Sequence, residues 1–291
     1  SGSIKDIQTA ADTACYIAKE QGSNRVHIYQ IGSDEITSHA NENIWLNKIN
    51  AALDKDNFVL YFQKISSVTD ANDAYYEVLV RMRDKQGNTI PPGVFIPAAE
   101  RFNIMSSIDK WVIRNTLPIM KIKKYDKVNF SINLSAQSLC DMHFMQTCID
   151  NIKSNDIAPG RICFEITETA AISNLPIAMD FIASVKTLGC SLALDDFGSG
   201  LCSFSYLKTI PVDYLKIDGS FITRMLENPL DLAIVIAIKQ ISLATQSKVI
   251  AEFVSTVEIK EKLQELGIDY GQGYGIAKPV PMHQLFKLTV V

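Results

Sequence analysis

From residue 57 onward, short apolar stretches alternate with longer stretches in which apolar residues recur at helical spacing. The eight expected strands are 58–65, 75–82, 129–135, 162–168, 191–197, 214–218, 248–254 and 269–275. The expected helices fill much of 97–124, 138–153, 174–188, 200–209, 222–246 and 257–267. Strands interleaved with helices in this way predict a β/α barrel. A doubly wound open sheet has the same rhythm and remains the alternative.

The part of the chain before residue 57 follows a different pattern. Residues 4–30 predict a helix followed by a strand, which together are too small to fold alone. Residues 34–55 predict a helix with an apolar stripe, interpreted as a linker helix that leads into the main domain. Ser1-Gly2-Ser3 resembles a remnant of cloning.

Polar residues interrupt the apolar strands mostly near their carboxyl ends. Glu165 and Glu168 close one strand, and Asp195 and Asp196 close the next. The same pattern recurs in other strands at Asn133, Lys216, Asp218, Glu252 and Gln272, while Glu77 precedes its apolar run. Active sites of β/α barrels lie at the carboxyl ends of the strands, so these side chains are expected to converge.

Converging carboxylates need a cation. Five of these residues are acidic: Glu77, Glu165, Asp195, Asp196 and Glu252. Buried without metal or partner they would repel one another at a high cost. Oxygen ligands favour Mg²⁺ or Mn²⁺ over zinc, and two such ions suit phosphodiester hydrolysis. Taken singly, each motif also has an ordinary structural interpretation; the Asp195–Gly200 segment could be a simple turn.

Composition excludes several other classes of protein. The net charge of −4, from 28 basic and 32 acidic residues, argues against binding a nucleic-acid polymer. No apolar run is long enough to span a membrane, and no membrane contact is expected. The six cysteines form no Cys-x-x-Cys pair, so buried thiols in a reducing cytoplasm are expected rather than zinc ligands or disulfides.

The ordered motifs resemble those of the EAL domain, the cyclic di-GMP phosphodiesterase family. Glu77-Val78-Leu79-Val80-Arg81 stands where the Glu-Ala-Leu-x-Arg motif belongs. The remaining matches are Pro92–Glu100, Asn133-Leu134-Ser135, Glu165-Ile166-Thr167-Glu168, Asp195–Gly200, Ser203–Leu207, Lys216-Ile217-Asp218, Ala251-Glu252 and Gln272-Gly273-Tyr274. The resemblance covers roughly residues 45–280 and implies a modified TIM (β/α)8 barrel whose first strand is antiparallel.

The resemblance also implies a role for each matching residue in the hydrolysis of cyclic di-GMP to linear pGpG. Metal ligands would be Glu77, Asn133, Glu165, Asp195, Asp196 and Glu252, around two Mg²⁺ or Mn²⁺ ions. The catalytic set would be Glu77, Asp196, Lys216 and Glu252, with Lys216 orienting the attacking water and Asp218 supporting it. Gln63, Arg81, Asn133, Asp218 and Gln272 would contact the substrate, and Glu168 would anchor the loop after Asp196.

The same resemblance suggests how the chain is organised. Residues 1–30 resemble the carboxyl-terminal part of a GGDEF domain, 31–56 would be the linker helix, and 57–291 the EAL barrel. The expected partners are cyclic di-GMP, a second copy of the chain in a homodimer, and upstream GGDEF and sensor domains. The expected location is the bacterial cytoplasm, with any membrane anchor lying upstream.

Four departures from the family pattern leave a second function open. Ser255 stands in place of a glutamate, Phe253 of a glycine, Lys64 of a proline and Met82 of a tryptophan. Serine lacks the negative charge that would help hold a second metal. Strand alternation would aim Phe253 away from Glu252. The alternative function is a catalytically weak or inactive EAL domain that acts as a cyclic di-GMP receptor. A scaffold that binds no nucleotide would leave the carboxylates uncompensated.

Overall fold

The computed structural model describes residues 35–69, 75–84, 86–199 and 204–288. The proposed GGDEF remnant therefore lies outside the described residues. Contacts divide the described chain into two units: one contains 58–81 together with the residues from 103 onward, and the other contains the residues up to 57 together with 82–102. In the described residues, every helix is too short or too polar to traverse a lipid bilayer.

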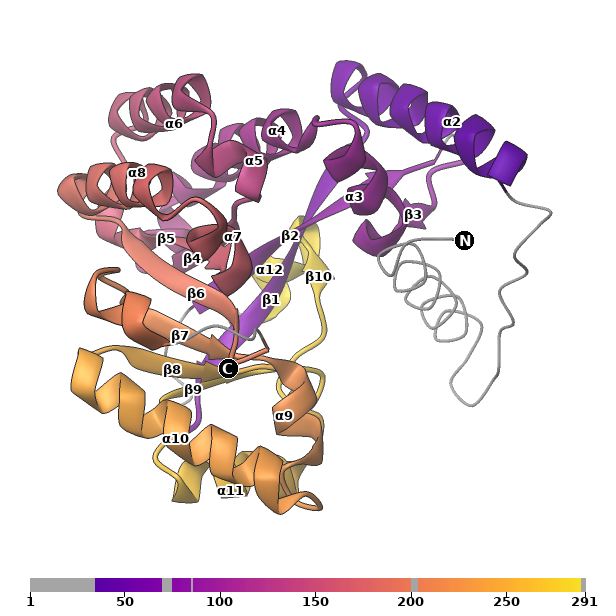
Figure 1. Ribbon diagram of the computed structural model, residues 1–291. Helices are drawn as coiled ribbons and strands as arrows, with labels where there is room; N and C mark the ends of the chain where they lie inside the picture. Colours follow the sequence, from indigo (N-terminus) through magenta and orange to yellow (C-terminus); the bar gives the residue numbers. More distant parts are fainter. Residues whose placement is uncertain (1–34, 70–74, 85, 200–203, 289–291) are drawn as a thin grey trace. The chain divides into compact units, whose positions relative to one another are not determined.

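The first unit is built around eight strands that close into a barrel (Figure 1). The barrel strands are β1 (Phe58–Ser67), β2 (Tyr75–Arg83), β4 (Asn129–Asn133), β5 (Ile162–Thr167), β6 (Ser191–Phe197), β7 (Tyr214–Ile217), β8 (Lys248–Ala251) and β9 (Tyr270–Gln272). Strands β2 and β4 to β9 run parallel to one another, whereas β1 is antiparallel to β9. Pairing of β1 with β2 completes the circle. The modified barrel is thereby confirmed, and the open doubly wound sheet was wrong.

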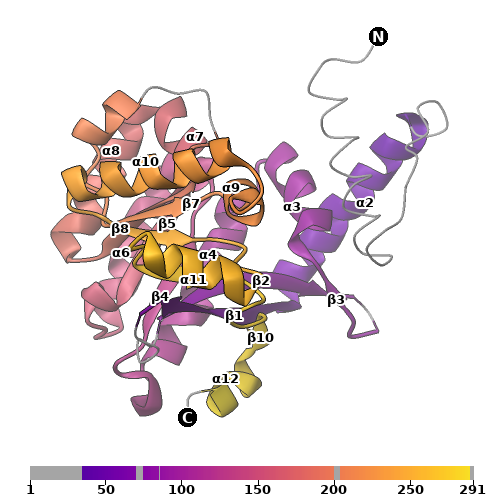
Figure 2. The same ribbon diagram turned by 90° about the horizontal axis from the view of Figure 1, so that it is seen from below.

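Helices surround these strands, as Figures 1 and 2 show for α8, α10 and α11. The α-helices of this unit are α4 (Met105–Met120), α5 (Ala136–Leu139), α6 (Met142–Ser154), α7 (Glu168–Ser173), α8 (Leu175–Leu188), α9 (Gly219–Arg224), α10 (Pro229–Thr245), α11 (Val257–Glu265) and α12 (Met282–Leu288). Short 3₁₀ turns occupy Lys123–Tyr125, Pro159–Arg161 and Phe204–Lys208, and a further strand, β10 (Val280–Pro281), pairs with β1.

Several predicted elements end earlier than the periodicity indicated. The helix expected over 222–246 is two helices, because Asn228 caps α10 through Leu230 N and Pro229 occupies its first turn. The strand expected over 248–254 ends at Ala251, and the one expected over 269–275 ends at Gln272. Glu168 begins α7 instead of closing β5, since Thr167 provides the cap.

Side-chain alternation along each strand separates the barrel interior from the helical layer. On β5, Phe164 points outward, where its ring lies 5.9 Å from that of Phe181 on α8. Cys163 and Glu165 point inward. Below the polar strand ends the interior is filled by Ile65, Tyr75, Cys163, Ala193, Ile250 and Tyr270. This packed floor leaves the carboxyl ends of the strands as the place where polar side chains can converge.

The second unit contains α2 (Glu35–Asp54), β3 (Thr89–Ile90) and α3 (Pro92–Arg101). β3 pairs antiparallel with the end of β2, where Met82 is opposite Ile90 and is buried. The helix expected over 34–55 is α2, and its role as a linker stays a prediction.

Candidate active site

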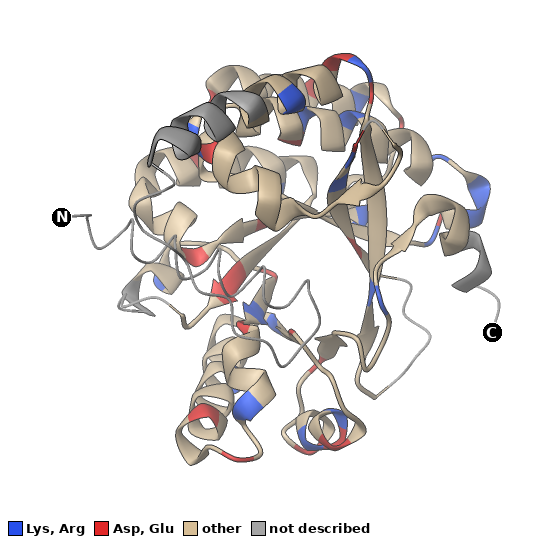
Figure 3. Ribbon diagram, turned by 90° about the vertical axis from the view of Figure 1, so that its right-hand side faces the viewer, with Lys and Arg blue, Asp and Glu red and all other residues tan. Residues whose placement is uncertain are grey.

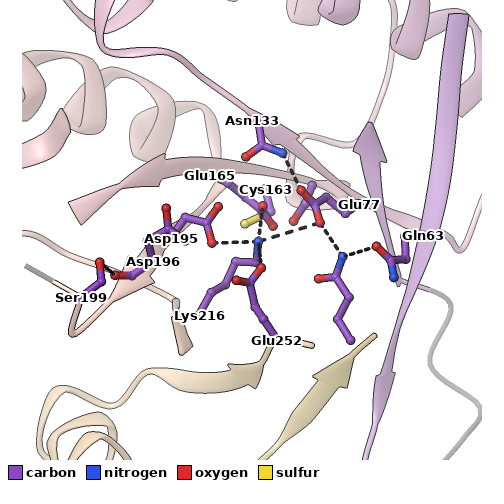
Figure 4. A network of polar contacts seen from close by, with 12 residues as sticks. Gln63, Glu77, Asn133, Cys163, Glu165, Asp195, Asp196, Ser199, Lys216 and Glu252 are labelled. Carbon is purple, nitrogen blue, oxygen red and sulfur yellow. Dashed lines mark hydrogen bonds and ion pairs between the residues drawn. The ribbon is translucent and has the colours of Figure 1, made fainter. Parts of the chain in front are cut away.

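A ring of polar side chains lies at the carboxyl ends of the parallel strands (Figure 4). Figure 3 shows acidic and basic segments on the strands inside the barrel. The ring contains Glu77 from β2, Asn133 from β4, Glu165 from β5, Asp195 from β6, Lys216 from β7, Gln272 from β9 and Glu252, directly after β8. Register explains the convergence, because Asn133 is level with Glu165 in the β4–β5 ladder. β1 runs the opposite way and contributes Gln63.

Lys216 is the cation at the centre of this ring. Its fully buried Nζ lies 2.8 Å from Glu165 Oε2, 2.9 Å from Asp195 Oδ1, 2.9 Å from Glu252 Oε1 and 3.9 Å from Glu77 Oε2. One ammonium group thus faces four carboxylates. Its charge cannot balance theirs, so the ring retains excess negative charge that a divalent cation would compensate.

Amide side chains hold the carboxylate of Glu77 from both sides. Asn133 Nδ2 donates to Glu77 Oε1 at 2.6 Å, and Gln272 Nε2 donates to Glu77 Oε2. The same Gln272 nitrogen lies 3.1 Å from Gln63 Oε1, and Gln63 Nε2 donates to the carbonyl oxygen of Ala277. The carboxylate is therefore oriented before any ligand arrives.

Burial and mutual repulsion shift the protonation of these groups. Burial raises the pKa of Glu165, and the nearby Lys216 opposes that shift only in part. The pKa of Glu252 is raised for the same reason. Burial alone would lower the pKa of Lys216, but the surrounding carboxylates outweigh it and hold that pKa well above its usual value. Lys216 is therefore charged, and Glu165 and Glu252 retain protons more readily than exposed acids do.

Adjacent aspartates at the end of β6 both lie close to Glu252. The β6–β7 ladder is irregular between Leu194 and Phe197, and Asp196 has a left-handed φ of 52°. This irregularity breaks the alternation that would otherwise send the two side chains to opposite faces. Ligand atoms of Asp195, Asp196 and Glu252 all lie within 4.8 Å of one another. Burial, together with Asp195 and Asp218, raises the pKa of Asp196 to about 6.

The donor set fits hard divalent cations. Carboxylate and amide oxygens are the ligands that Mg²⁺ and Mn²⁺ prefer. Within the described part of the chain, the buried Glu165 Oε1 and Gln272 Oε1 have no hydrogen-bond partner. The free Glu165 oxygen, buried beside an excess of negative charge, fits a metal ligand, and the free Gln272 oxygen fits a group that accepts a hydrogen bond from a bound ligand.

Comparison with known proteins decides the family. The EAL domain family matches residues 46–279. The chain belongs to the EAL domain family. It is 39% identical over 281 residues to the cyclic di-GMP phosphodiesterase PdeB of Shewanella oneidensis, covering 96% of this chain and 33% of PdeB. Against the cyclic di-GMP phosphodiesterase PdeF of Escherichia coli it is 38% identical over 239 residues, covering 81% of this chain and 32% of PdeF. The chain thus spans about a third of the length of these curated relatives.

Solved structures of EAL proteins have the same fold. The PaMucR phosphodiesterase in complex with c-di-GMP superposes with a TM-score of 0.79 at 28% identity, over 83% of this chain and 99% of that one. The EAL domain of FimX from Pseudomonas aeruginosa, bound to c-di-GMP, gives a TM-score of 0.76 at 29% identity, over 81% and 96% of the two chains. The barrel is therefore that of EAL proteins.

The loop after Asp196 is tied to the EAL barrel by Glu168. Glu168 Oε2 accepts a hydrogen bond from Gly198 N at 3.0 Å, and Glu168 Oε1 accepts one from Tyr206 Oη at 2.7 Å. These contacts fit the anchoring role expected for Glu168. Sequence reasoning assigned no role to Tyr206, although its place just beyond the Asp195–Gly200 motif was a usable signal.

Two expected site residues lie at the margin of the ring. Arg81 donates from Nη1 to the carbonyl oxygen of Val80, and its guanidinium lies 5.5 Å from the ring centre of Tyr61. Asp218 accepts from Ser220 N at the start of α9 and contributes to the raised pKa of Asp196.

Proposed function

We propose that this EAL domain hydrolyses cyclic di-GMP to linear pGpG with two divalent cations, Mg²⁺ or Mn²⁺. The observation that carries the proposal is the ring of four carboxylates around the buried Lys216. The relatives PdeB and PdeF are cyclic di-GMP phosphodiesterases, and the similar PaMucR phosphodiesterase structure holds c-di-GMP, which supports the same substrate. A receptor has no evident need for so much unbalanced buried charge.

The ring's oxygen ligands divide into one set for each ion. Glu77, Asn133, Glu165 and Asp195 would hold one ion, and Asp196 with Glu252 would hold the second. When bound, the ions supply a hydroxide at neutral pH and neutralise charge on the phosphoryl oxygens. Gln272 and Asn133 keep the Glu77 carboxylate in place, so its oxygens need little reorganisation when a cation arrives.

The chain's own residues orient water and substrate. Lys216 Nζ, charged and fully buried, lies within 2.9 Å of the Glu165, Asp195 and Glu252 carboxylates and would position the attacking water beside them. Asp218 would support that water from the side of Asp196. Gln63 and Gln272 present amides on the β1–β9 side, and Arg81 lies at the edge of β2; these three would contact the ligand.

Binding of cyclic di-GMP without turnover is the second candidate function. It is favoured by Ser255, which is exposed three residues beyond Glu252, where the family pattern has a glutamate. Loss of that charge would weaken the second ion, without which the attacking water is less acidic. All the ligands for the first ion remain, so hydrolysis is the function that the geometry supports better.

One assay separates these functions. The protein is incubated with cyclic di-GMP and Mg²⁺ or Mn²⁺, and chromatography measures the formation of pGpG. The expected result is turnover by the wild type and none by Glu77→Ala. Tight binding with no product would favour the receptor. Normal turnover by Glu77→Ala would contradict the assignment of Glu77 as a metal ligand.

We also propose that the domain forms a homodimer. The outer face of α10 exposes Leu230, Ile236 and Leu243 by 66%, 40% and 60%, and Leu226 lies just before the helix. Exposed apolar residues grouped on one helix are typical of an interaction surface. Sedimentation tests this: Leu230→Asp with Leu243→Asp is expected to yield a monomer, and an unchanged dimer would place the interface elsewhere.

The wider context of the chain is proposed from resemblance alone. Upstream GGDEF and sensor domains would regulate the barrel, and the domain would act in the bacterial cytoplasm without contacting the membrane. The length of the relatives, about three times the matched segment in PdeB, is compatible with further domains.

A further inference from the structure

Two aromatic side chains are exposed to solvent just beyond the ends of neighbouring strands. Among the large apolar side chains that the described chain exposes, only Phe253 and Tyr274 are aromatic, with 65% and 68% of their surface accessible. Phe253 follows Glu252 after β8, and Tyr274 lies two residues beyond the end of β9. A Lys278 ammonium already lies 5.5 Å from the ring centre of Tyr274, whereas no cation is recorded over Phe253 in the described residues.

The backbone at Phe253 has a conformation that phenylalanine rarely adopts. Its φ is 52°, in the left-handed region where a side chain with a Cβ is disfavoured. The strand has ended at Ala251, so the alternation on which the expected direction of this ring rested does not extend to residue 253. The left-handed backbone of Phe253 costs free energy, and burial of its ring does not repay that cost because the ring is exposed. This combination points to a functional reason.

Gly219, the first residue of α9, leaves room for this ring because it has no side chain. A Cβ added to Gly219 would lie 2.1 Å from the Phe253 ring, so a residue with a side chain at position 219 would displace it. Gly219 directly follows Asp218, and Asp218 affects the pKa of Asp196. The ring therefore lies against the first residue of α9, which directly follows Asp218, and Phe253 itself directly follows Glu252 of the acidic cluster; most of its surface is open to solvent.

We propose that Phe253 is a stacking surface for one guanine base of the cyclic dinucleotide. This inference rests on the proposed function. A phosphodiester bound at Asp195, Asp196 and Glu252 has its flanking nucleosides within reach of the strand ends on either side. The β1–β9 side offers the amides of Gln63 and Gln272, and the β7–β8 side offers the exposed Phe253 ring. A flat apolar ring binds a base by stacking and shows little preference between bases.

The test compares Phe253→Leu with the wild type. Leucine keeps apolar bulk and the same backbone demand, but it removes the flat ring. The KM for cyclic di-GMP is expected to rise about tenfold with kcat within twofold of the wild type, because a ground-state contact is lost that persists in the transition state. Val257→Ala is the matched control: it truncates a side chain that is 66% exposed four residues farther on, and it is expected to leave both constants unchanged.

A second measurement does not depend on turnover. The F253W variant places an indole on the rim, and its emission is expected to change saturably as cyclic di-GMP is added, beyond the response of the wild type with Trp45 and Trp111. An unchanged KM in Phe253→Leu together with no added response in F253W would overturn the role of Phe253. Failure of the wild type itself to bind or cleave cyclic di-GMP would instead overturn the proposed function.

Discussion

Replacing Lys216 with methionine removes the buried cation and leaves four carboxylates facing one another. Three of those carboxylates lie within 2.9 Å of the ammonium, and all the groups are at least 85% buried. Removing one partner of a buried ion pair typically costs about 3–5 kcal/mol, because the remaining charge is uncompensated. For a domain of this size that loss lowers the melting temperature by roughly 10 °C.

The pH at which Lys216→Met is studied sets the size of the effect. Burial already raises the pKa of Glu165 and Glu252, and without the ammonium both would take up protons at still higher pH. Protonation removes the repulsion, so the destabilisation is expected to be largest at pH 8 and to shrink as the pH falls. Added Mg²⁺ should stabilise the variant more than the wild type, since it supplies the missing positive charge.

Thermal unfolding in a chelator, at pH 8 and at pH 5.5, measures this effect. Lys186→Met is the matched control, because Lys186 lies 2.7 Å from Asp213 in a pair that is about one-third exposed. That pair is expected to contribute at most about 1 kcal/mol. A Lys216→Met protein as stable as Lys186→Met at pH 8 would refute the view that Lys216 holds the ring together.

Three further changes test other parts of the structure. Glu168→Gln should lower kcat by about tenfold with little change in melting temperature, because one acceptor for Gly198 N or Tyr206 Oη is lost; normal kcat would show that the loop needs no anchor. Asp141→Ala should cost about 1 kcal/mol at pH 7, since Asp141 caps α6 through His143 N and Phe144 N. These bonds lower the pKa of Asp141, so its stabilisation should disappear as the pH falls through that lowered pKa, and a difference that persists in acid would contradict the cap. Ser255→Glu should lower the Mg²⁺ concentration needed for half-maximal rate; an unchanged requirement would show that position 255 does not affect the second ion.

The positions of most ring residues followed from the sequence because one physical rule governs them. Polar residues late in parallel strands meet at one end of a barrel, which placed Asn133, Glu165 and Lys216 correctly. The joint use of Asp195 and Asp196 depends on a local break in the hydrogen-bond ladder. Periodicity carries no information on such a break, although the glycines after Asp196 indicated that the strand was ending.

Strand alternation could not decide the orientation of Phe253 from the sequence. Alternation assumes a continuing strand, but β8 ends at Ala251, and the left-handed φ at residue 253 turns the chain. The ring in that conformation lies against Gly219, a residue distant in sequence that has no side chain to displace it. The split between α9 and α10 was different in kind, because Asn228-Pro229 is a local start signal that could have been recognised.

Single-turnover hydrolysis in ¹⁸O-labelled water tests the central claim most directly. Wild type or Glu77→Gln, in molar excess over cyclic di-GMP, is incubated with the substrate and Mg²⁺. The mass of the product is then measured by mass spectrometry. Water positioned by Lys216 and activated in the carboxylate ring should yield pGpG carrying one ¹⁸O in its terminal phosphate, with no product from Glu77→Gln. Intact cyclic di-GMP after incubation with the wild type, or unlabelled pGpG, would contradict direct hydrolysis at this site.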